Sequence, residues 1–259
     1  RGTVAVNKLA GAASTPQNRI SDESMASRVV AYWTRKYHNG VPLSSTTPFV
    51  VHRLDYETSG VFVVAKTKEA ATKMQSSFEE RRVRKTYLAL CCCRSGSSSS
   101  SSGSGGEQEQ QGGTITYPLV KDNDNTGRKA KVRCLTDEAD DGGGAKVMKP
   151  TETDWRILQR NESYALIEAR PRTGRTHQIR AHLAAVGWPI VGDAAYGDRD
   201  DRGRVIISRH ALHAHTLTFI DAEKNEGIPP VRIVAPPPRD FIRACAAVGI
   251  SDEVLFTRE

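Results

Sequence analysis

The segment His52–Gly60, which reads HRLDYETSG, places the carboxylate of Asp55 in a loop between two expected strands. Hydroxyl and backbone donors of Thr58, Ser59 and Gly60 follow it closely and can keep the carboxylate ionised, as a nucleophile or a general base requires. The same residues can equally form an ordinary Asx turn with no chemical role. The segment alone therefore leaves a catalytic and a structural interpretation of Asp55 open.

A second segment, Arg170–His182 (RPRTGRTHQIRAH), concentrates arginines where a strand should end in a glycine turn and a helix should begin. The N–H groups at a helix N-terminus and nearby guanidinium groups favour phosphate binding. Arg180 lies beside Ile179 at the edge of the buried helix face, from which it could point inward at a carboxylate. A solvated basic turn without a ligand is the simpler interpretation of this segment on its own.

Tyr87 is the third candidate, in the expected strand Lys85–Cys91. Alternation along the strand places it on the same face as Ala89, opposite Leu88 and Leu90. Tyrosines at such positions belong to a core more often than they contact a ligand. By itself, the position of Tyr87 indicates packing rather than chemistry.

Cofactor and metal signals are weak. His210, His213 and His215 are close in the sequence, but they lack companion cysteines or acids at metal-ligand spacing, so we expect no metal site. No GxGxxG or Walker A sequence opens a helix, and we therefore expect no nucleotide cofactor.

The composition favours a polyanionic partner. Among 259 residues, Lys and Arg number 37 against 30 acidic residues, which gives a net charge of +7. This excess is compatible with RNA or DNA binding but does not prove it. With 38% hydrophobic residues the chain can form a core. No run approaches the roughly 18 consecutive apolar residues of a membrane helix, so we expect no membrane-spanning segment.

The cysteines argue against a disulfide framework. They are odd in number and three of them are adjacent, at positions Cys91, Cys92, Cys93, Cys134 and Cys245. Free thiols fit a reducing, intracellular location. Mitochondrion, nucleus and cytoplasm all remain open, and we expect a monomer.

The elements that must position the candidate residues are mostly strands joined by turns. Patterning and turn residues predict strands at Thr3–Asn7, Phe49–His52, Gly60–Lys66, Lys85–Cys91, Trp155–Leu158, Tyr164–Ala169, Val205–Ile207, Thr216–Ile220 and Val231–Val234. Asn161–Ser163 should close a hairpin between Trp155–Leu158 and Tyr164–Ala169. A helix should follow Thr67, whose hydroxyl can cap it, and another should span Thr176–Val186 and end at Gly187 in the left-handed conformation. This order predicts an α+β fold, a mixed and mostly antiparallel β-sheet core flanked by helices.

Two low-complexity stretches interrupt the pattern. Residues 95–113 are rich in Ser and Gly, and residues 137–146 are acidic and glycine-rich. Neither can bury apolar surface, so we expect disordered insertions in hairpin connections. The prediction is one catalytic domain over residues 1–259 that carries these two insertions.

Taken together, the motifs resemble one family. HRLDxxTSG, KTYLAL and TGRTHQIRxHLxxxGxPIxGDxxYG occur in the order typical of the RluA-like pseudouridine synthases. The resemblance begins at Val6–Gly11 (VNKLAG), continues through Leu212–His215 and ends near Ala235–Pro238. The sequence departs from the family at Leu9, where a proline is usual, and no S4-type RNA-binding domain is expected.

The resemblance implies an RNA pseudouridine synthase that isomerises a specific uridine in ribosomal or transfer RNA without a cofactor. Asp55 matches the essential aspartate, and Tyr87 the aromatic residue that stacks on the target uracil. Arg180 matches the basic partner of the aspartate, and Arg53 the arginine that takes up space left by the flipped base. Whether Asp55 attacks C1′ or removes the 2′-proton stays open.

Two other classes of function were weighed against this one. A catalytically idle RNA-binding or ribosome-assembly factor on the same fold is compatible with the basic charge. The intact set of Asp55, Tyr87 and Arg180 argues against it. A glycosidase is disfavoured because only one carboxylate lies in a credible pocket, where two are ordinarily required.

Overall fold

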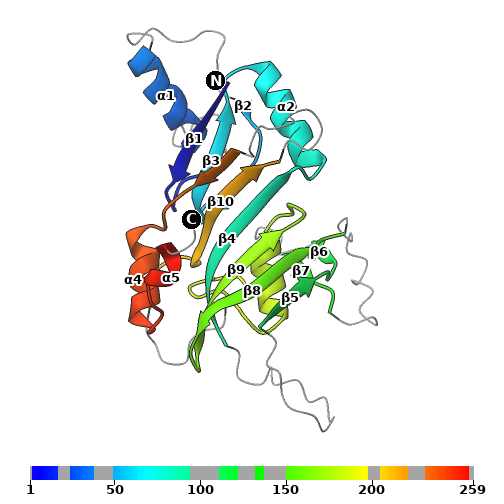
Figure 1. Cartoon of the computed structure of the whole chain (residues 1–259), viewed down its shortest axis with the longest axis vertical. Helices are drawn as coiled ribbons and strands as arrows, with labels where there is room; N and C mark the ends of the chain where they lie inside the picture. Colours follow the sequence, from blue (N-terminus) through cyan, green and yellow to red (C-terminus); the bar gives the residue numbers. More distant parts are fainter. Residues whose placement is uncertain are drawn as a thin grey trace, which may run out of the picture. The chain divides into compact units, whose positions relative to one another are not determined.

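The computed structural model describes residues 2–16, 24–37, 49–93, 111–121, 132–136, 150–197, 205–220 and 231–256. They divide into two compact units. Figure 1 labels the helices and strands of both. The first unit comprises Arg1–Lys85 and His213–Pro238, and the second comprises Thr86–Leu212 and Arg239–Glu259. The expectation of one domain over residues 1–259 stays a prediction.

The first unit is built on a small mixed sheet. Its elements are β1 (Thr3–Lys8), α1 (Met25–Tyr37), β2 (Phe49–Val50), β3 (Ser59–Ala65), α2 (Lys68–Glu79), β10 (Leu212–Phe219) and β11 (Val231–Val234). Strands β1 and β2 pair with β3 antiparallel, β11 pairs with β10 antiparallel, and the start of β10 runs parallel to β3. Strand β3 is therefore the centre of this unit.

The sequence explains why β3 takes this place. All seven of its residues, SGVFVVA, are buried, as expected for a strand covered on both faces. Gly60 has φ +117°, and a Cβ there would lie 2.1 Å from the carbonyl oxygen of Ala214, so only glycine allows β10 to approach. Helix α2 covers the strand and begins at Thr67, whose side chain accepts a hydrogen bond from the N–H of Ala70 at 3.2 Å.

The second unit contains an antiparallel sheet in the order β4-β9-β8-β5 and a separate two-stranded β6-β7 ribbon. Its elements are β4 (Val83–Cys92), β5 (Gly112–Ile115), β6 (Leu119–Lys121), β7 (Val132–Cys134), β8 (Thr153–Arg160), β9 (Tyr164–Pro171), α3 (Gln178–Ala185), α4 (Arg239–Ala247) and α5 (Glu253–Phe256). The first three residues of β4 belong to the first unit.

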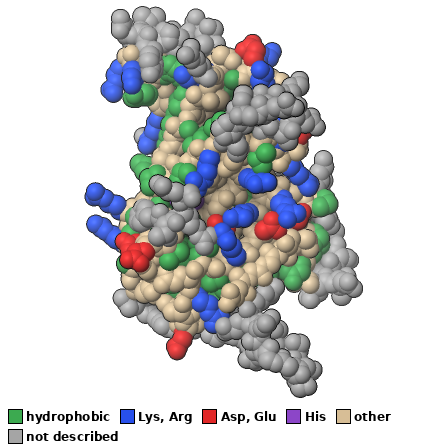
Figure 2. All heavy atoms as spheres, viewed as in Figure 1, with side chains coloured by type: hydrophobic (Ala, Val, Ile, Leu, Met, Phe, Trp, Pro, Cys, Tyr) green, Lys and Arg blue, Asp and Glu red, His purple; other side chains and the backbone are tan. Residues whose placement is uncertain are grey.

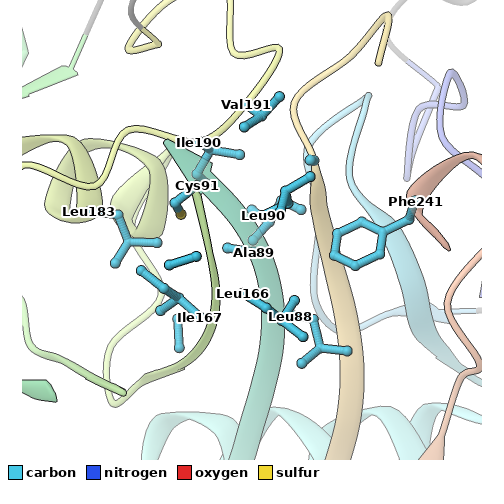
Figure 3. Packing of buried hydrophobic residues seen from close by; sticks show 14 of the residues in the cluster. Leu88, Ala89, Leu90, Cys91, Leu166, Ile167, Leu183, Ile190, Val191 and Phe241 are labelled. Carbon is cyan, nitrogen blue, oxygen red and sulfur yellow. The ribbon is translucent and has the colours of Figure 1, made fainter. Parts of the chain in front are cut away.

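One hydrophobic core holds the second unit together. Figure 3 shows side chains of β4 and β9 between Leu183 of α3 on one side and Phe241 of α4 on the other. Cys91 lies within this core, and burial raises the pKa of its thiol well above the usual value. All five cysteines are free. Burial thus makes Cys91 a packing residue.

Most of the expected elements are confirmed. The α+β class, the capped helix after Thr67, the hairpin around Asn161 and the left-handed Gly187 (φ +84°) are all present. Asn161 closes the hairpin because its side-chain oxygen accepts hydrogen bonds from the N–H groups of Ser163 and Tyr164. Each of these features depends on residues close in the sequence, which is why the sequence pattern was sufficient to predict it.

Three expectations were wrong or incomplete. Val205–Ile207 forms no strand, and helices α1 and α4 were not anticipated. Gly112 and Gly113 were assigned to a disordered insertion but pair with β8 as part of β5. A Cβ on Gly112 would lie 2.6 Å from the carbonyl oxygen of Trp155, so the glycine there permits close pairing. Residues 95–110 and 137–146 lie outside the described residues.

Candidate active site

Asp55 begins a β-turn between β2 and β3. The N–H of Thr58 donates to the backbone oxygen of Asp55 at 3.1 Å, so Tyr56 and Glu57 are the two central residues of the turn. Asp55 itself is half-buried, whereas Leu54 before it and Thr58 after it are buried. The carboxylate therefore lies at the edge of the core, on a short and defined turn.

Ser14 fixes the backbone directly before Asp55. Its hydroxyl oxygen accepts a hydrogen bond from the N–H of Leu54 at 2.9 Å and donates one to the carbonyl oxygen of Leu54 at 2.8 Å. Ser14 and Leu54 are both buried, so water cannot replace either bond. One hydroxyl thus satisfies both backbone groups of the residue that precedes the carboxylate.

Lys8 fixes the backbone directly after Asp55. Its ammonium group is fully buried and donates to the carbonyl oxygens of Leu9, Ala12 and Tyr56 at 3.0, 2.7 and 3.1 Å. The carbonyl oxygen of Tyr56 also accepts from the N–H of Gly11 at 3.0 Å. The backbone is therefore held on both sides of Asp55, which fixes the position from which its side chain projects.

His52 anchors the start of the same loop. Its Nε2 accepts the N–H of Val63 at 2.9 Å, and its ring lies 5.2 Å from Phe62 and 5.3 Å from Phe78, centroid to centroid. Burial, with a smaller contribution from the charge of Lys85, lowers the pKa of His52 to about 4. His52 is therefore neutral at neutral pH and positions the loop.

Arg53 follows His52 and points outward. Its side chain is exposed, and within the described part of the chain no ion pair holds it. The loop therefore presents one guanidinium group two residues before Asp55, where it can meet an anionic ligand.

Ser59 differs from the expectation that its hydroxyl helps to hold the Asp55 carboxylate. Its Oγ is hydrogen-bonded to Nδ1 of His213 at 3.0 Å, while Nε2 of His213 bonds the carbonyl oxygen of Ala235 at 2.9 Å. A carbonyl only accepts, so in the neutral imidazole Nε2 carries the proton and Ser59 donates to Nδ1. Ser59 thus joins β3 to β10 and β11 instead.

In the second unit, Arg180 is bound by Asp193. Nε and Nη2 of Arg180 donate to the two carboxylate oxygens of Asp193, each at 2.7 Å, and both side chains are buried. Burial alone raises the pKa of Asp193, but the hydrogen bond and charge of Arg180, with the N–H of Ala195, outweigh it and leave the pKa below its usual value. This two-point pair fixes the plane of the guanidinium group.

The residues around this pair reinforce its geometry. The guanidinium carbon of Arg180 lies 5.2 Å from the ring centroid of Tyr196, whose hydroxyl is 3.2 Å from Nδ1 of His177. His177 has φ +56°, which a residue other than glycine rarely adopts, and it immediately precedes α3. Arg180 is thus held by a carboxylate, an aromatic ring and a strained helix start.

A buried polar network connects α3 to β8. Gln178 donates to the carbonyl oxygen of Glu152 at 2.9 Å and to the hydroxyl of Thr153 at 3.0 Å. The Thr153 hydroxyl is also 2.9 Å from Nδ1 of His182, whose Nε2 is 3.1 Å from the carbonyl oxygen of Tyr117. Burial lowers the pKa of His182 to about 4, although the bond to the Tyr117 carbonyl opposes this shift. His182 is a neutral packing residue.

The other arginines of the expected phosphate site are mostly paired with acids. Arg170 contacts Glu168 at 2.8 Å, and Arg172 contacts both Glu152 and Asp154 at 2.8 Å. Figure 2 shows such basic and acidic side chains interspersed over β8 and β9. The Nε atom of Arg175 is buried without a hydrogen-bond partner among the described residues. The segment is therefore an ion-paired surface rather than a cluster of unpaired arginines.

Tyr87 is half-buried in β4, where it pairs with Ala169 of β9 and packs against the core of the second unit. Asp55 and Arg53 thus belong to the first unit, and Tyr87 and Arg180 to the second. The expected contacts between these two sets stay predictions.

Sequence reasoning missed the residues that hold the site. Lys8 and Asp193 lie in the motifs VNKLAG and GDxxYG, which carry the family resemblance, but no role was predicted for either residue. Their positions in these motifs could have indicated that they matter. Ser14 had no such signal, because its partner Leu54 lies 40 residues away in the sequence.

No metal-binding arrangement is present in the described ranges: they contain no group of three or more His, Cys, Asp or Glu side chains that could hold an ion. His213 uses both ring nitrogens in hydrogen bonds, to Ser59 and to Ala235. In the part of the chain that the structure describes, no helix has the length and apolar character to cross a membrane.

Comparison with known proteins gives a consistent result. The family described as RNA pseudouridylate synthase matches residues 2–185. The chain is 34% identical over 220 residues to ribosomal large subunit pseudouridine synthase D of Xylella fastidiosa, covering 81% of this chain and 57% of that protein. It is 36% identical over 195 residues to a protein of Zymomonas mobilis named as an uncharacterized RNA pseudouridine synthase, covering 75% of each. The chain spans between about half and three quarters of these relatives' lengths.

Solved structures agree on the fold. Human RNA pseudouridylate synthase domain containing 1 superposes with a TM-score of 0.62 at 28% identity, covering 92% of this chain and 81% of that one. Human RNA pseudouridylate synthase domain containing 4 gives a TM-score of 0.64 at 24% identity, covering 95% and 90%. The resemblance noted in the motifs is confirmed: this chain belongs to the RNA pseudouridylate synthase family.

Proposed function

We propose that this chain converts a uridine of RNA to pseudouridine and that Asp55 supplies the reacting carboxylate. The observation that carries the proposal is the fixation of the backbone on both sides of Asp55, by Ser14 through Leu54 and by Lys8 through Tyr56. Such fixation of a half-buried carboxylate exceeds what a connecting turn needs. Family membership supplies the chemistry that the carboxylate would perform.

The reaction requires no external reagent. The C1′–N1 bond of the uridine breaks, the uracil turns in place, and C5 bonds to C1′. The hydrogen on C5 is then lost and N1 gains one, so the product has the same atoms as the substrate. Asp55 either attacks C1′ or removes the 2′-proton, and both routes need its ionised form.

The remaining candidates complete the site in this proposal. Tyr87 stacks on the target uracil after it leaves the helical stack, which offsets the cost of unstacking. For Arg180, whose guanidinium plane is fixed by Asp193, the proposed role is that of the basic partner of the aspartate, which the family motif assigns to this position. Arg53, exposed beside the turn, takes up the space that the flipped base vacates.

We further propose ribosomal RNA as the substrate. Several relatives are named ribosomal large subunit pseudouridine synthase C or D, and the net charge of +7 suits a polyanion. Transfer RNA is the competing substrate class.

The test uses unmodified transcripts of ribosomal and transfer RNA with the purified chain and maps pseudouridine at single-nucleotide resolution. Asp55→Asn should form none, while Glu57→Gln, in the same turn, should keep most activity. Pseudouridine formed by Asp55→Asn at the wild-type rate would overturn the assignment. Tight RNA binding by the wild type without any pseudouridine would instead support an idle RNA-binding factor.

A further inference from the structure

Tyr56 is an exposed aromatic residue at the corner of the Asp55 turn. Its side chain is 55% exposed, and its hydroxyl makes no hydrogen bond to any described residue. It occupies the first central position of the turn, and its exposure shows that the ring faces solvent. A large apolar ring is thus presented to solvent one residue after the carboxylate.

The backbone that presents this ring is rigid. The carbonyl oxygen of Tyr56 accepts hydrogen bonds from Lys8 Nζ at 3.1 Å and from the N–H of Gly11 at 3.0 Å. The same ammonium group holds the carbonyl oxygen of Leu9, whose side chain is 59% exposed. A ring on a fixed backbone loses only side-chain freedom on binding, so little entropy opposes stacking.

The surroundings favour a nucleotide as the occupant. Arg53, to which the proposed function assigns the space left by the flipped base, is exposed on the same loop, and an exposed tyrosine ring is the usual surface on which an unstacked base is bound. A uridine that reacts at Asp55 leaves its neighbours in the strand close to the adjacent residue of the loop. Asp55 and Tyr56 thus offer groups to a reacting nucleoside and to a second base.

We propose that Tyr56 stacks on the nucleobase next to the target uridine and so sets which base is preferred there. The inference rests on the proposed synthase activity and adds a residue that reads sequence context. Preference should be for a purine, because the larger ring system stacks more strongly on an aromatic side chain.

The experiment uses the full chain and a pool of tiled fragments of ribosomal and transfer RNA in which the nucleotides beside each uridine are varied. Pseudouridine formation is sequenced for wild type, Tyr56→Ala and Tyr56→Phe. Loss of one stacked base should raise KM of Tyr56→Ala about ten- to a hundredfold with kcat within about twofold. The purine preference should disappear in Tyr56→Ala and persist in Tyr56→Phe.

Tyr32→Ala is the matched control, since Tyr32 is 54% exposed in the same unit but lies on α1. It should change neither KM nor sequence preference. Equal melting temperatures of the wild type and all variants would show that the kinetic changes do not arise from unfolding.

The outcomes separate the two proposals. Wild type that modifies no fragment would refute the synthase activity and this inference with it. Wild type that is active, with Tyr56→Ala sharing its KM and its sequence preference, would refute the stacking role alone. A KM change in Tyr56→Ala that Tyr56→Phe does not rescue would also overturn stacking, since the phenyl ring keeps the aromatic face.

Discussion

The hydroxyl of Ser14 bonds both backbone polar groups of Leu54, at 2.9 Å to the N–H and 2.8 Å to the carbonyl oxygen, although 40 residues separate the two in the sequence. Because Leu54 precedes Asp55, this contact joins the N-terminal segment of the chain to the candidate carboxylate. The position of the Asp55 carboxylate is therefore coupled to the position of the N-terminal segment that carries Ser14.

Ser14→Ala should leave the N–H and carbonyl of Leu54 buried without partners, at a cost of about 1–3 kcal/mol in unfolding free energy. The loosened loop should lower kcat for pseudouridine formation about tenfold or more, with KM nearly unchanged. Urea denaturation and steady-state kinetics measure the two effects. Ser77→Ala is the control, since the buried Ser77 hydroxyl bonds only the Lys73 carbonyl within α2. Equal kcat values in both variants would contradict the positioning role of Ser14.

Gly60→Ala should prevent β10 from pairing with β3. The new Cβ would lie 2.1 Å from the carbonyl oxygen of Ala214, and φ is +117°, so the backbone itself must shift. We expect a chain that does not fold cooperatively or that loses more than about 3 kcal/mol of stability. Gly11→Ala is the comparison: it also has a positive φ (+76°), but nothing lies within 4 Å, so only about 1–2 kcal/mol of strain is expected. Similar melting temperatures for the two variants would refute the steric argument.

Asp193→Asn should remove the charge that balances the buried Arg180. The loss of a carboxylate from a buried pair costs about 3–5 kcal/mol, because the guanidinium group stays in the interior. Glu152→Gln removes a carboxylate from the partly exposed pair with Arg172 and should cost less than about 1 kcal/mol. Chemical denaturation of both variants decides the point, and an equally small loss in each would show that Arg180 has another sufficient partner.

Acid should destabilise the second unit through His182. Burial lowers its pKa in the folded state from 6.5 to about 4, so between these values the unfolded chain binds a proton that the folded chain does not. Stability contributed by neutral His182 is therefore complete above pH 6.5 and is lost as pH falls towards 4, by up to about 3 kcal/mol. Unfolding free energies measured from pH 7.5 to 4.5 give this slope. His182→Gln should reduce it, whereas an unchanged slope would assign the effect to other groups. His52, with a similarly lowered pKa, should contribute over the same range.

The sequence alone was sufficient for features that depend on adjacent residues. The cap at Thr67, the hairpin at Asn161 and the left-handed Gly187 each follow from side-chain or backbone chemistry within four residues. The apolar run Gly60–Lys66 predicted a strand where β3 (Ser59–Ala65) lies, and the order of motifs identified the family. Caps, turns and sequence motifs all depend on residues that are close in the sequence, so the sequence was sufficient to predict them.

Only the tertiary structure decided which residues hold the candidate site. Lys8 reaches Tyr56 across 48 residues, Ser14 reaches Leu54 across 40, and Ser59 bonds His213 instead of the Asp55 carboxylate across 154. Each bond arises because packing brings two distant strands or loops together, and a buried polar group must then bond whatever lies beside it. Sequence thus named Asp55, while the folded chain determined how its loop is fixed and which neighbouring ring is presented to solvent.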